Sequence, residues 1–323
     1  MSEMRWNPIL SEWVVTATHR QDRTFLPPAG YCPLCPTAPG GFPTEVPETD
    51  YDFVVFDNKF PSLKIDAGEP SIQGNDLHPV RPSQGICEVV LYSSNHTGTL
   101  TDLSTTKIQE LVRVWRDRYE ELGSHKDIDY VFIFENKGEA IGVTIHHPHG
   151  QIYAFSYLPP KILRELTSEK EHLERTGRCL HCDIVEGEIK EAKRIVAESD
   201  HFIAFIPFYA RYPYEVHIYS KAHRGSLSDF SAGEENDLGT LLHEVLKKYD
   251  GLWNMSMPYM MVMHQKPTDG KDWPGCHFHI EFYPPLRTPQ KLKYLAGCES
   301  GAGTFVNDTL PEEKAGELRA VKI

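Results

Sequence analysis

The sequence lacks long apolar runs and compositionally biased tracts. No stretch of 18 or more apolar residues occurs among its 323 positions, and the first residues, Met1 to Trp6, carry no apolar signal core. A membrane-spanning helix and a secretory leader are therefore not expected, and we predict a cytoplasmic protein. With 40% hydrophobic and 24% charged residues, the chain has an ordinary globular composition. At this length, one large domain or two packed domains are expected.

Basic residues are also scarce. The chain has 33 Lys and Arg against 46 Asp and Glu, which gives a formal net charge of −13. This balance argues against a general nucleic-acid binder, whose affinity would depend on clustered basic side chains. An anionic small molecule would have to be held by local groups against the overall field.

Seven cysteines are present, an odd number that does not suit a disulfide framework. Four of them form two Cys-x-x-Cys pairs, Cys32/Cys35 and Cys179/Cys182. In a chain without a secretion signal, such pairs indicate metal ligation. A redox role is disfavoured because neither pair opens a βαβ unit.

The sequence contains an internal repeat. Residues 88–104 and 215–231 are identical at nine of 17 positions, with an offset of 127 residues. Each copy is expected to form a strand, a turn that contains a histidine, and an amphipathic helix. The predicted apolar helix faces are Ile108, Leu111, Val112, Trp115 and Tyr119 in the first copy, and Leu238, Leu241, Leu242, Val245 and Tyr249 in the second. Gly123 and Gly251 are expected to end these helices.

The repeat extends beyond these segments. A Cys-x-x-Cys pair precedes each copy, and a His-x-His strand follows each one, His147/His149 in the first and His277/His279 in the second. We therefore predict an α+β fold with two antiparallel sheets and flanking helices, divided into repeats at residues 1–175 and 176–323. Two copies are too few for a solenoid, so a single body with pseudo-twofold symmetry is expected.

Each repeat supplies two thiols and two imidazoles, which is the ligand set of a closed tetrahedral zinc site. The first predicted set is Cys32, Cys35, His96 and His147, and the second is Cys179, Cys182, His223 and His277. Two zinc ions per chain are therefore expected. The first would fix the loop region around the cysteine pair to the sheet and contribute to folding.

The segment from Thr144 to Tyr153 contains three histidines and a glutamine within six residues. His147 and His149 alternate at strand spacing, so their side chains should point to one face. Pro148 and Gly150 interrupt the regular ladder, and a glycine there indicates a bulge or a close backbone approach. The pattern favours a ligand-binding site over a strand end with ordinary histidines.

Three elements, Asn136-Lys137-Gly138, Gly142 and His147-Pro148-His149-Gly150-Gln151, closely resemble the galactose-1-phosphate uridylyltransferase family. This family is a duplicated branch of the histidine-triad superfamily, and the resemblance covers nearly the whole chain. It implies an internally duplicated histidine-triad-like fold. It also implies ping-pong transfer of UMP from UDP-glucose to galactose 1-phosphate, so a nucleotide sugar and a hexose 1-phosphate are the expected partners.

The resemblance assigns roles to individual residues. It makes His149 the nucleophile that carries the uridylyl group, and an imidazole with a pKa near ~6.5 is largely neutral at pH 7. Gln151 would donate to the phosphoryl oxygens without passing a proton to water. Lys293 would act at the sugar-phosphate end. The nucleotide would be held by Arg20, Arg23, Asn58, Asn136, Gly142, Val143, Thr144 and Gln151.

The chain departs from the best-known members in two places. Those members imply a second metal site of Glu165, His264, His277 and His279, holding iron or zinc, but Cys179 and Cys182 compete for His277. We favour the cysteine set because thiolates are the better zinc ligands. In addition, Cys298 and Phe305 stand where those members have Tyr and Gln in contact with the hexose.

Two alternative functions stay open, and so does the oligomeric state. An ADP-glucose phosphorylase or adenylyltransferase of the same fold is the first alternative function, since the sequence does not determine the base or the hexose. A zinc-knuckle binding module without catalysis is the second. The resemblance also implies a homodimer.

Overall fold

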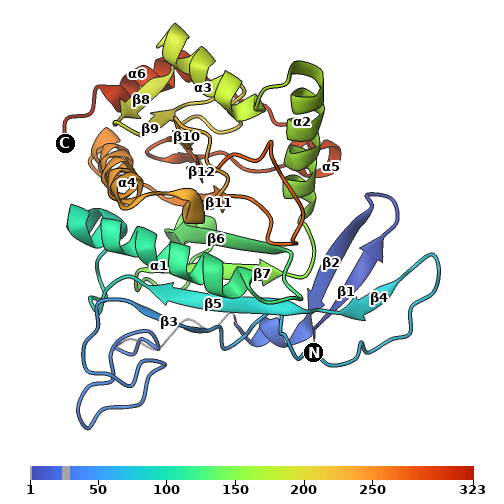
Figure 1. The fold of residues 1–323 in the computed structure, drawn as a ribbon. Coiled ribbons are helices and arrows are strands. Elements are labelled where there is room, and N and C mark those ends of the chain that lie inside the picture. The colour runs from blue at the N-terminus through green and yellow to red at the C-terminus, as the bar shows by residue number, and fades with distance from the viewer. Residues whose placement is uncertain (1, 24–29) are drawn as a thin grey trace.

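The computed structural model describes residues 2–23 and 30–323, and its centre is one nine-stranded antiparallel sheet (Figure 1). The strands of this sheet are β3 (Val54–Asp57), β5 (Gly85–Leu91), β6 (Tyr130–Lys137), β7 (His149–Phe155), β8 (Ile195–Glu198), β9 (Phe202–Phe205), β10 (Val216–Ser220), β11 (Tyr259–His264) and β12 (His279–Tyr283). They follow the order β3-β5-β7-β6-β11-β12-β10-β9-β8.

The two repeats occupy separate halves of this sheet in mirrored order. β5, β7 and β6 of the first repeat are matched by β10, β12 and β11 of the second. The halves meet where β6 pairs with β11, with Glu135 opposite Met261. The predicted α+β fold is confirmed. The two expected sheets are joined into one, because pairing these two edges satisfies backbone groups that would otherwise be unpaired.

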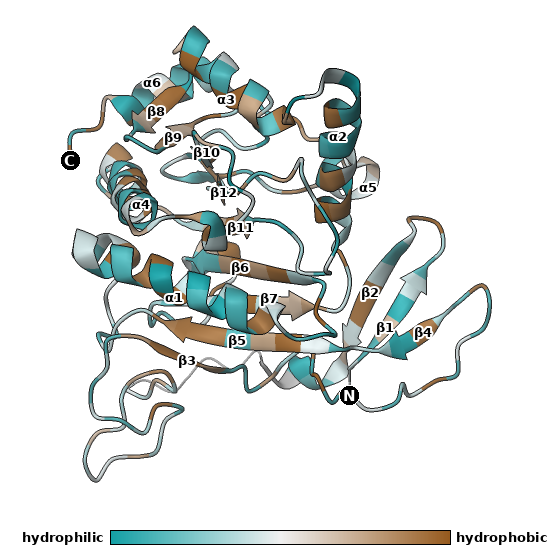
Figure 2. Ribbon diagram, viewed as in Figure 1, coloured by the Kyte–Doolittle hydropathy of each residue, from teal (hydrophilic) through white to brown (hydrophobic). Residues whose placement is uncertain are grey.

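Two long helices, α1 (Thr105–Gly123) and α4 (Ala232–Leu252), lie side by side over one face of the sheet (Figure 1). All the residues predicted to form their apolar faces are buried. Figure 2 shows the resulting alternation of hydrophobic and hydrophilic residues along α1. Equivalent serines cap both helices, since Ser104 accepts from the Lys107 amide and Ser231 from the Glu234 amide.

On the opposite face of the sheet, helices cover the second half and the end of β6 at Tyr130. Ile162 and Leu166 of α2 (Pro160–Thr176) pack against Tyr130, and Val185 of α3 (Leu180–Glu191) packs against Phe205. The remaining helices are α5 (Gly297–Ala302), α6 (Pro311–Arg319), η1 (Thr18–Arg23), η2 (Leu100–Asp102), η3 (Glu139–Ile141) and η4 (Leu227–Asp229). Around His149 and Gln151, the residues on this face come from strands, loops and η3.

Two small sheets complete the fold. β1, β2 and β4 project from the main body as a three-stranded sheet (Figure 1). β13 and β14 form a hairpin before α5. The bounds of these strands are Ser2–Asn7 (β1), Glu12–Ala17 (β2), Val80–Pro82 (β4), Leu286–Thr288 (β13) and Lys291–Leu292 (β14).

The strand register changes which residues of the two repeats are equivalent, by one position. The offset of 127 aligns Tyr92 with Tyr219, but strand pairing makes Leu91, opposite His149, the counterpart of Tyr219, opposite His279. Tyr92 accordingly joins the core beneath α1 and α4, whereas Tyr219 lies on the other face. A shift of one residue reverses the face of every side chain in a strand. The offset of 127 does hold for the 3-10 helices η2 and η4.

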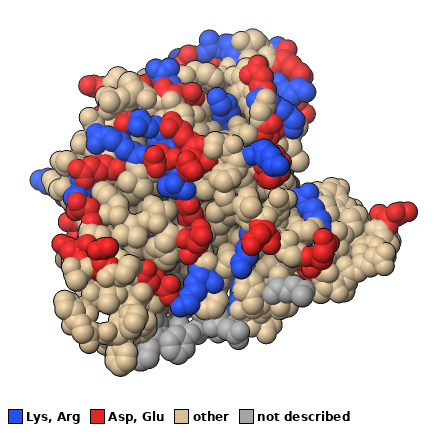
Figure 3. Space-filling view, turned by 60° about the horizontal axis from the view of Figure 1, so that its bottom comes forward, with Lys and Arg blue, Asp and Glu red and all other residues tan. Residues whose placement is uncertain are grey.

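Among the described residues, no helix is long and apolar enough to cross a membrane. Acidic and basic side chains are spread among each other over the face shown in Figure 3.

The contact between α1 and α4 generates a stability prediction. A Cβ added at Gly239 of α4 would lie 2.8 Å from the Gln109 Cα of α1. Gly239→Ala must push the helices apart and should lower the free energy of unfolding by about 1–3 kcal/mol. Urea unfolding measures this change.

Gly187→Ala in α3 is the matched control, because an added Cβ there meets nothing within 4 Å. In this variant the free energy of unfolding should rise by up to about 1 kcal/mol, because alanine has a higher helix propensity than glycine. Equal stability of the two variants would contradict the predicted close approach.

Candidate functional site

His149 begins β7 and has a fixed tautomer. Its Nδ1 lies 2.8 Å from the backbone carbonyl oxygen of His147, so Nδ1 carries the hydrogen and donates it. The other ring nitrogen, Nε2, is left with its lone pair. Burial lowers the pKa of His149, which favours the neutral ring. A half-buried, neutral imidazole with one free lone pair can act as a nucleophile.

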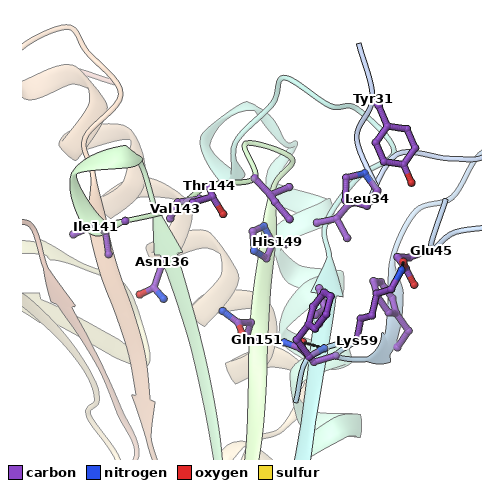
Figure 4. A pocket seen from close by; sticks show the side chains of 17 residues that line it. Tyr31, Leu34, Glu45, Lys59, Asn136, Ile141, Val143, Thr144, His149 and Gln151 are labelled. Carbon is purple, nitrogen blue, oxygen red and sulfur yellow. Dashed lines mark hydrogen bonds and ion pairs between the residues drawn. The ribbon is translucent and has the colours of Figure 1, made fainter. Parts of the chain in front are cut away.

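A cavity of about 390 Å³ lies over His149 on the face of the sheet opposite α1 and α4. Figure 4 shows His149 and Gln151 between two ends of this cavity, with Asn136 and Ile141 on one side and Leu34 and Glu45 on the other. The lining residues are Tyr31, Pro33, Leu34, Glu45, Phe56, Asn58, Lys59, Phe60, Val89, Asn136, Ile141, Gly142, Val143, Thr144, Ile145, His149 and Gln151.

Gln151 lies on the same face of β7 as His149 and is buried. Its Oε1 has no hydrogen-bond partner among the described residues. A buried amide oxygen without a partner is costly, so an unpaired amide at a cavity indicates a group that a ligand completes. The prediction that His149 and Gln151 share a face is confirmed by their common cavity.

The turn before β7 forms one end of the cavity. Gly138 and Gly142 flank η3 with φ angles of 92° and 85°, in the region that favours glycine. This turn brings Val143 and Thr144 beside Asn136. Asn136, Gly142, Val143 and Thr144 were predicted to bind substrate, and the fold brings all four together with His149.

At Gly150, neighbouring atoms approach the backbone closely, as predicted. An added Cβ would lie 2.0 Å from the Tyr92 hydroxyl and 3.2 Å from the Phe134 carbonyl oxygen. Tyr92 is buried behind β7, beneath α1 and α4. No larger side chain fits between His149 and Gln151 unless Tyr92 or the strand moves.

The first predicted metal set gathers in one place. Cys32, Cys35, His96 and His147 offer ligand atoms that all lie within 4.8 Å of one another. Cys35 Sγ is 3.4 Å from His96 Nδ1 and 3.6 Å from His147 Nδ1. His147 Nε2 donates to the Ser93 carbonyl oxygen at 2.9 Å, which turns Nδ1 toward the cysteines. Burial and the neighbouring Cys32 raise the pKa of Cys35 to about 11. A pair of thiolates therefore needs a cation, and the donor set fits zinc.

The second predicted set has the same geometry. Cys179, Cys182, His223 and His277 also gather within 4.8 Å. Cys182 Sγ is 3.7 Å from His223 Nδ1 and 3.6 Å from His277 Nδ1. His277 Nε2 lies 2.8 Å from the Ser220 carbonyl oxygen, as His147 does with Ser93. The two repeats thus build one ligand arrangement twice.

Three residues of the alternative set for the second metal, Glu165, His264 and His279, gather with Glu281 in place of His277. His277 faces the cysteines, and the third cluster is Glu165, His264, His279 and Glu281. The motif spacing alone did not show which histidine faces which cluster. Strand pairing decides it, because His264 lies opposite His279 in the sheet.

The cavity over His149 is much larger than the pocket beside His279, about 390 Å³ against about 10 Å³. His279 Nδ1 contacts the His277 carbonyl oxygen at 3.0 Å, which parallels the bond at His149. Helix α2, however, lies over this position, and its Glu165 carboxylate accepts from His264 Nδ1 at 2.7 Å. Lys161 of the same helix pairs with Glu281. The space that is open above His149 is filled above His279.

The other residues predicted to bind substrate lie in different parts of the fold. Asn58 lines the cavity, but Arg20 does not, and its guanidinium donates to the Tyr153 hydroxyl at 3.1 Å. Lys293 is buried in the second half, where its ammonium donates to the Val306 carbonyl oxygen. The side chain of Arg23 lies outside what the structure describes.

Sequence reasoning missed one end of the cavity. Leu34, Val89 and Phe56 form a small hydrophobic cluster there, and Glu45 and Lys59 add charge. The position of Leu34 between Cys32 and Cys35 was the available signal, because a knuckle that holds a metal also fixes the residue inside it. Nothing in the local sequence distinguished Glu45.

Comparisons with known proteins identify the family and the fold. Residues 1–159 match the family model for galactose-1-phosphate uridyl transferase, N-terminal domain, and residues 165–322 match that for the C-terminal domain. The chain is 41% identical to galactose-1-phosphate uridylyltransferase of Thermotoga maritima, over 100% of the chain and 99% of that protein.

Two solved structures are also similar. A uridylyltransferase structure has a TM-score of 0.87 and 35% identity, covering 99% of this chain and 98% of that one. An ADP-glucose phosphorylase from Arabidopsis thaliana with bound ADP-glucose has a TM-score of 0.75 and 25% identity, covering 100% and 99%.

The close approach at Gly150 predicts a destabilised variant. Gly150→Ala should lose about 1–3 kcal/mol of unfolding free energy, because its methyl group overlaps the Tyr92 hydroxyl. Adding Tyr92→Phe removes that hydroxyl, which makes no well-aligned hydrogen bond of its own, and should restore part of the loss. Urea unfolding of the single and double variants measures the coupling. A double variant no more stable than Gly150→Ala would refute this explanation.

Proposed function

The chain belongs to the galactose-1-phosphate uridylyltransferase family, and we propose that it transfers UMP from UDP-glucose to galactose 1-phosphate through His149. The observation that carries this proposal is the hydrogen bond from His149 Nδ1 to the His147 carbonyl oxygen, which leaves Nε2 as the nucleophile beneath the cavity. The activity is that of a UDP-glucose–hexose-1-phosphate uridylyltransferase.

The first half-reaction forms the covalent intermediate. His149 Nε2 attacks the α-phosphorus of UDP-glucose, a P–N bond forms, and the P–O bond to glucose 1-phosphate breaks. The ring gains positive charge as the bond forms, and the His147 carbonyl oxygen stabilises it through the Nδ1 hydrogen. Glucose 1-phosphate leaves with the bonding electrons.

The second half-reaction reverses the chemistry with a new acceptor. A phosphate oxygen of galactose 1-phosphate attacks the same phosphorus, the P–N bond breaks, and UDP-galactose forms. Gln151 donates its amide hydrogens to the phosphoryl oxygens in both steps. Because an amide has no titratable proton in this range, Gln151 does not help water attack the intermediate.

The remaining cavity residues position the substrate. Asn136, Val143 and Thr144 lie beside His149 and would hold the phosphoryl groups. Asn58 also lines the cavity and precedes Lys59 in the chain, and it would contact the nucleoside. Arg20 would act near Tyr153, on the same strand face as His149.

Zinc fits both cysteine-histidine clusters. Cys32, Cys35, His96 and His147 would hold the first ion, which would fix the backbone two residues before His149. Cys179, Cys182, His223 and His277 would hold the second, with iron as the alternative for that position. A zinc ion in such closed sets supplies structural stability. We also propose a cytoplasmic homodimer, as the family resemblance implies.

The adduct on His149 is directly testable. Incubation with UDP-glucose alone should release glucose 1-phosphate once per site and leave an acid-labile uridylyl group on the protein. Intact-mass measurement and peptide mapping locate the group, and His149→Ala should take none.

ADP-glucose is the comparison substrate in this experiment. Stronger labelling by ADP-glucose would favour an adenylyltransferase or phosphorylase of the same fold. Labelling of His149→Ala, or of another residue, would remove His149 from the mechanism.

Elemental analysis tests the metal assignment. The purified protein should contain about two zinc ions per chain. Cys179→Ser combined with Cys182→Ser should lower the count to about one and leave most activity. Cys32→Ser combined with Cys35→Ser should lower both metal content and activity, because His147 lies next to the catalytic segment. An unchanged count in the first double variant would instead place the second metal at Glu165, His264, His279 and Glu281.

A further inference from the structure

The cavity has a chemically distinct end away from the phosphate groups. His149 and Gln151 separate Asn136 and Ile141 on one side from Leu34 and Glu45 on the other (Figure 4). Phe56 and Val89 cluster with Leu34, so this second side has the apolar walls that a planar base packs against. A nucleotide with its α-phosphorus at His149 therefore directs its base toward Glu45.

One ion pair stands at this end. Lys59 Nζ lies 2.6 Å from Glu45 Oε1, and both residues line the cavity. Among the described residues that line the cavity, Lys59 is the one lysine or arginine and Glu45 the one acidic residue. Their side chains are 63% and 29% exposed, respectively, so they stand at the mouth.

The backbones that carry this pair are held in place. The Glu45 amide donates to the Pro33 carbonyl oxygen at 2.9 Å, inside the first cysteine knuckle. Next to Lys59, the Asn58 amide donates to the Cys87 carbonyl oxygen at 2.8 Å, and Asn58 Oδ1 accepts from the Phe60 amide at 2.9 Å. Two side chains on fixed backbones can present a donor and an acceptor in a defined order.

We propose that the Glu45–Lys59 pair reads the nucleobase and selects uracil over adenine. The inference rests on the proposed function and names the residues that set its base specificity. An ammonium has three donors and a carboxylate has several acceptor sites, so the pair can keep its own bond and still engage a base.

The order of donors and acceptors gives the selection. Uracil presents a carbonyl oxygen to the Lys59 ammonium and the neighbouring N3–H to the Glu45 carboxylate. Adenine presents an amino group and a lone pair at the corresponding positions, so each would face a group of its own kind. Wrong pairing of this type leaves polar groups unsatisfied and lowers affinity.

Binding of UMP and AMP to the full-length protein, measured by calorimetry, tests this proposal independently of catalysis. The wild type should prefer UMP. Lys59→Met and Glu45→Gln should each weaken UMP binding about tenfold and leave AMP binding nearly unchanged. Lys107→Met is the control, because Lys107 pairs with Asp52 at 2.8 Å and does not line the cavity. It should retain the wild-type ratio of the two Kd values.

The charge-reversed double variant Glu45→Lys with Lys59→Glu separates base reading from loop support. It keeps an ion pair but exchanges donor and acceptor, so UMP binding should stay weak and the preference should move toward AMP. Recovery of the wild-type ratio would show that the pair only holds the loops together and would overturn the proposal.

The wild type distinguishes this inference from the proposed function. Absence of a uridylyl group on His149 after UDP-glucose treatment would refute the proposed function, while the Kd ratios still test the pair. A wild type that binds neither nucleotide, or prefers AMP, would overturn the base-reading proposal.

Discussion

The site depends on the bond from His149 Nδ1 to the backbone carbonyl oxygen of His147. This bond fixes the tautomer, the ring orientation and the direction of Nε2 together, so the proposed attack by His149 needs no separate base. It also ties the nucleophile to a residue whose own side chain lies in a cysteine-histidine cluster. The position of His149 therefore follows from the fold of the segment before it, and Gly150 allows that segment to lie directly against Tyr92.

The second repeat shows that this bond alone does not make an open site. His279 makes the equivalent contact with His277, beside an equivalent cluster. The difference lies above the ring, where α2 places Lys161 and Glu165 against Glu281 and His264. A duplicated fold thus offers two positions for a nucleophile, and the helix that covers one face decides which of them a substrate can reach.

Much of this architecture could be predicted from the sequence, because periodicity and spacing are local properties. The helix faces of α1 and α4 and both Cys-x-x-Cys sets follow from residue patterns and are found as predicted. Strand register is not local. The repeat alignment places Tyr92 with Tyr219, yet they lie on opposite faces, since one residue of slip is invisible in identities and decisive in a sheet. For the same reason the sequence did not predict that Glu281 joins a cluster with Glu165 of α2 and His264 of β11.

The apolar end of the cavity connects the first cysteine-histidine cluster to the proposed nucleoside site. Leu34 lies within the first knuckle, and the Glu45 amide bonds to Pro33 beside it, so the wall of the cavity is part of the loop that the cysteines hold. The other wall comes from β3 and the residues after it, which are fixed by the sheet. The width of this end is therefore the distance between the loop that carries the first cysteine pair and the β3 strand, which is held by its hydrogen bonds to β5. Because the same cluster includes His147, loss of its order would disturb the nucleoside wall and the nucleophile at once.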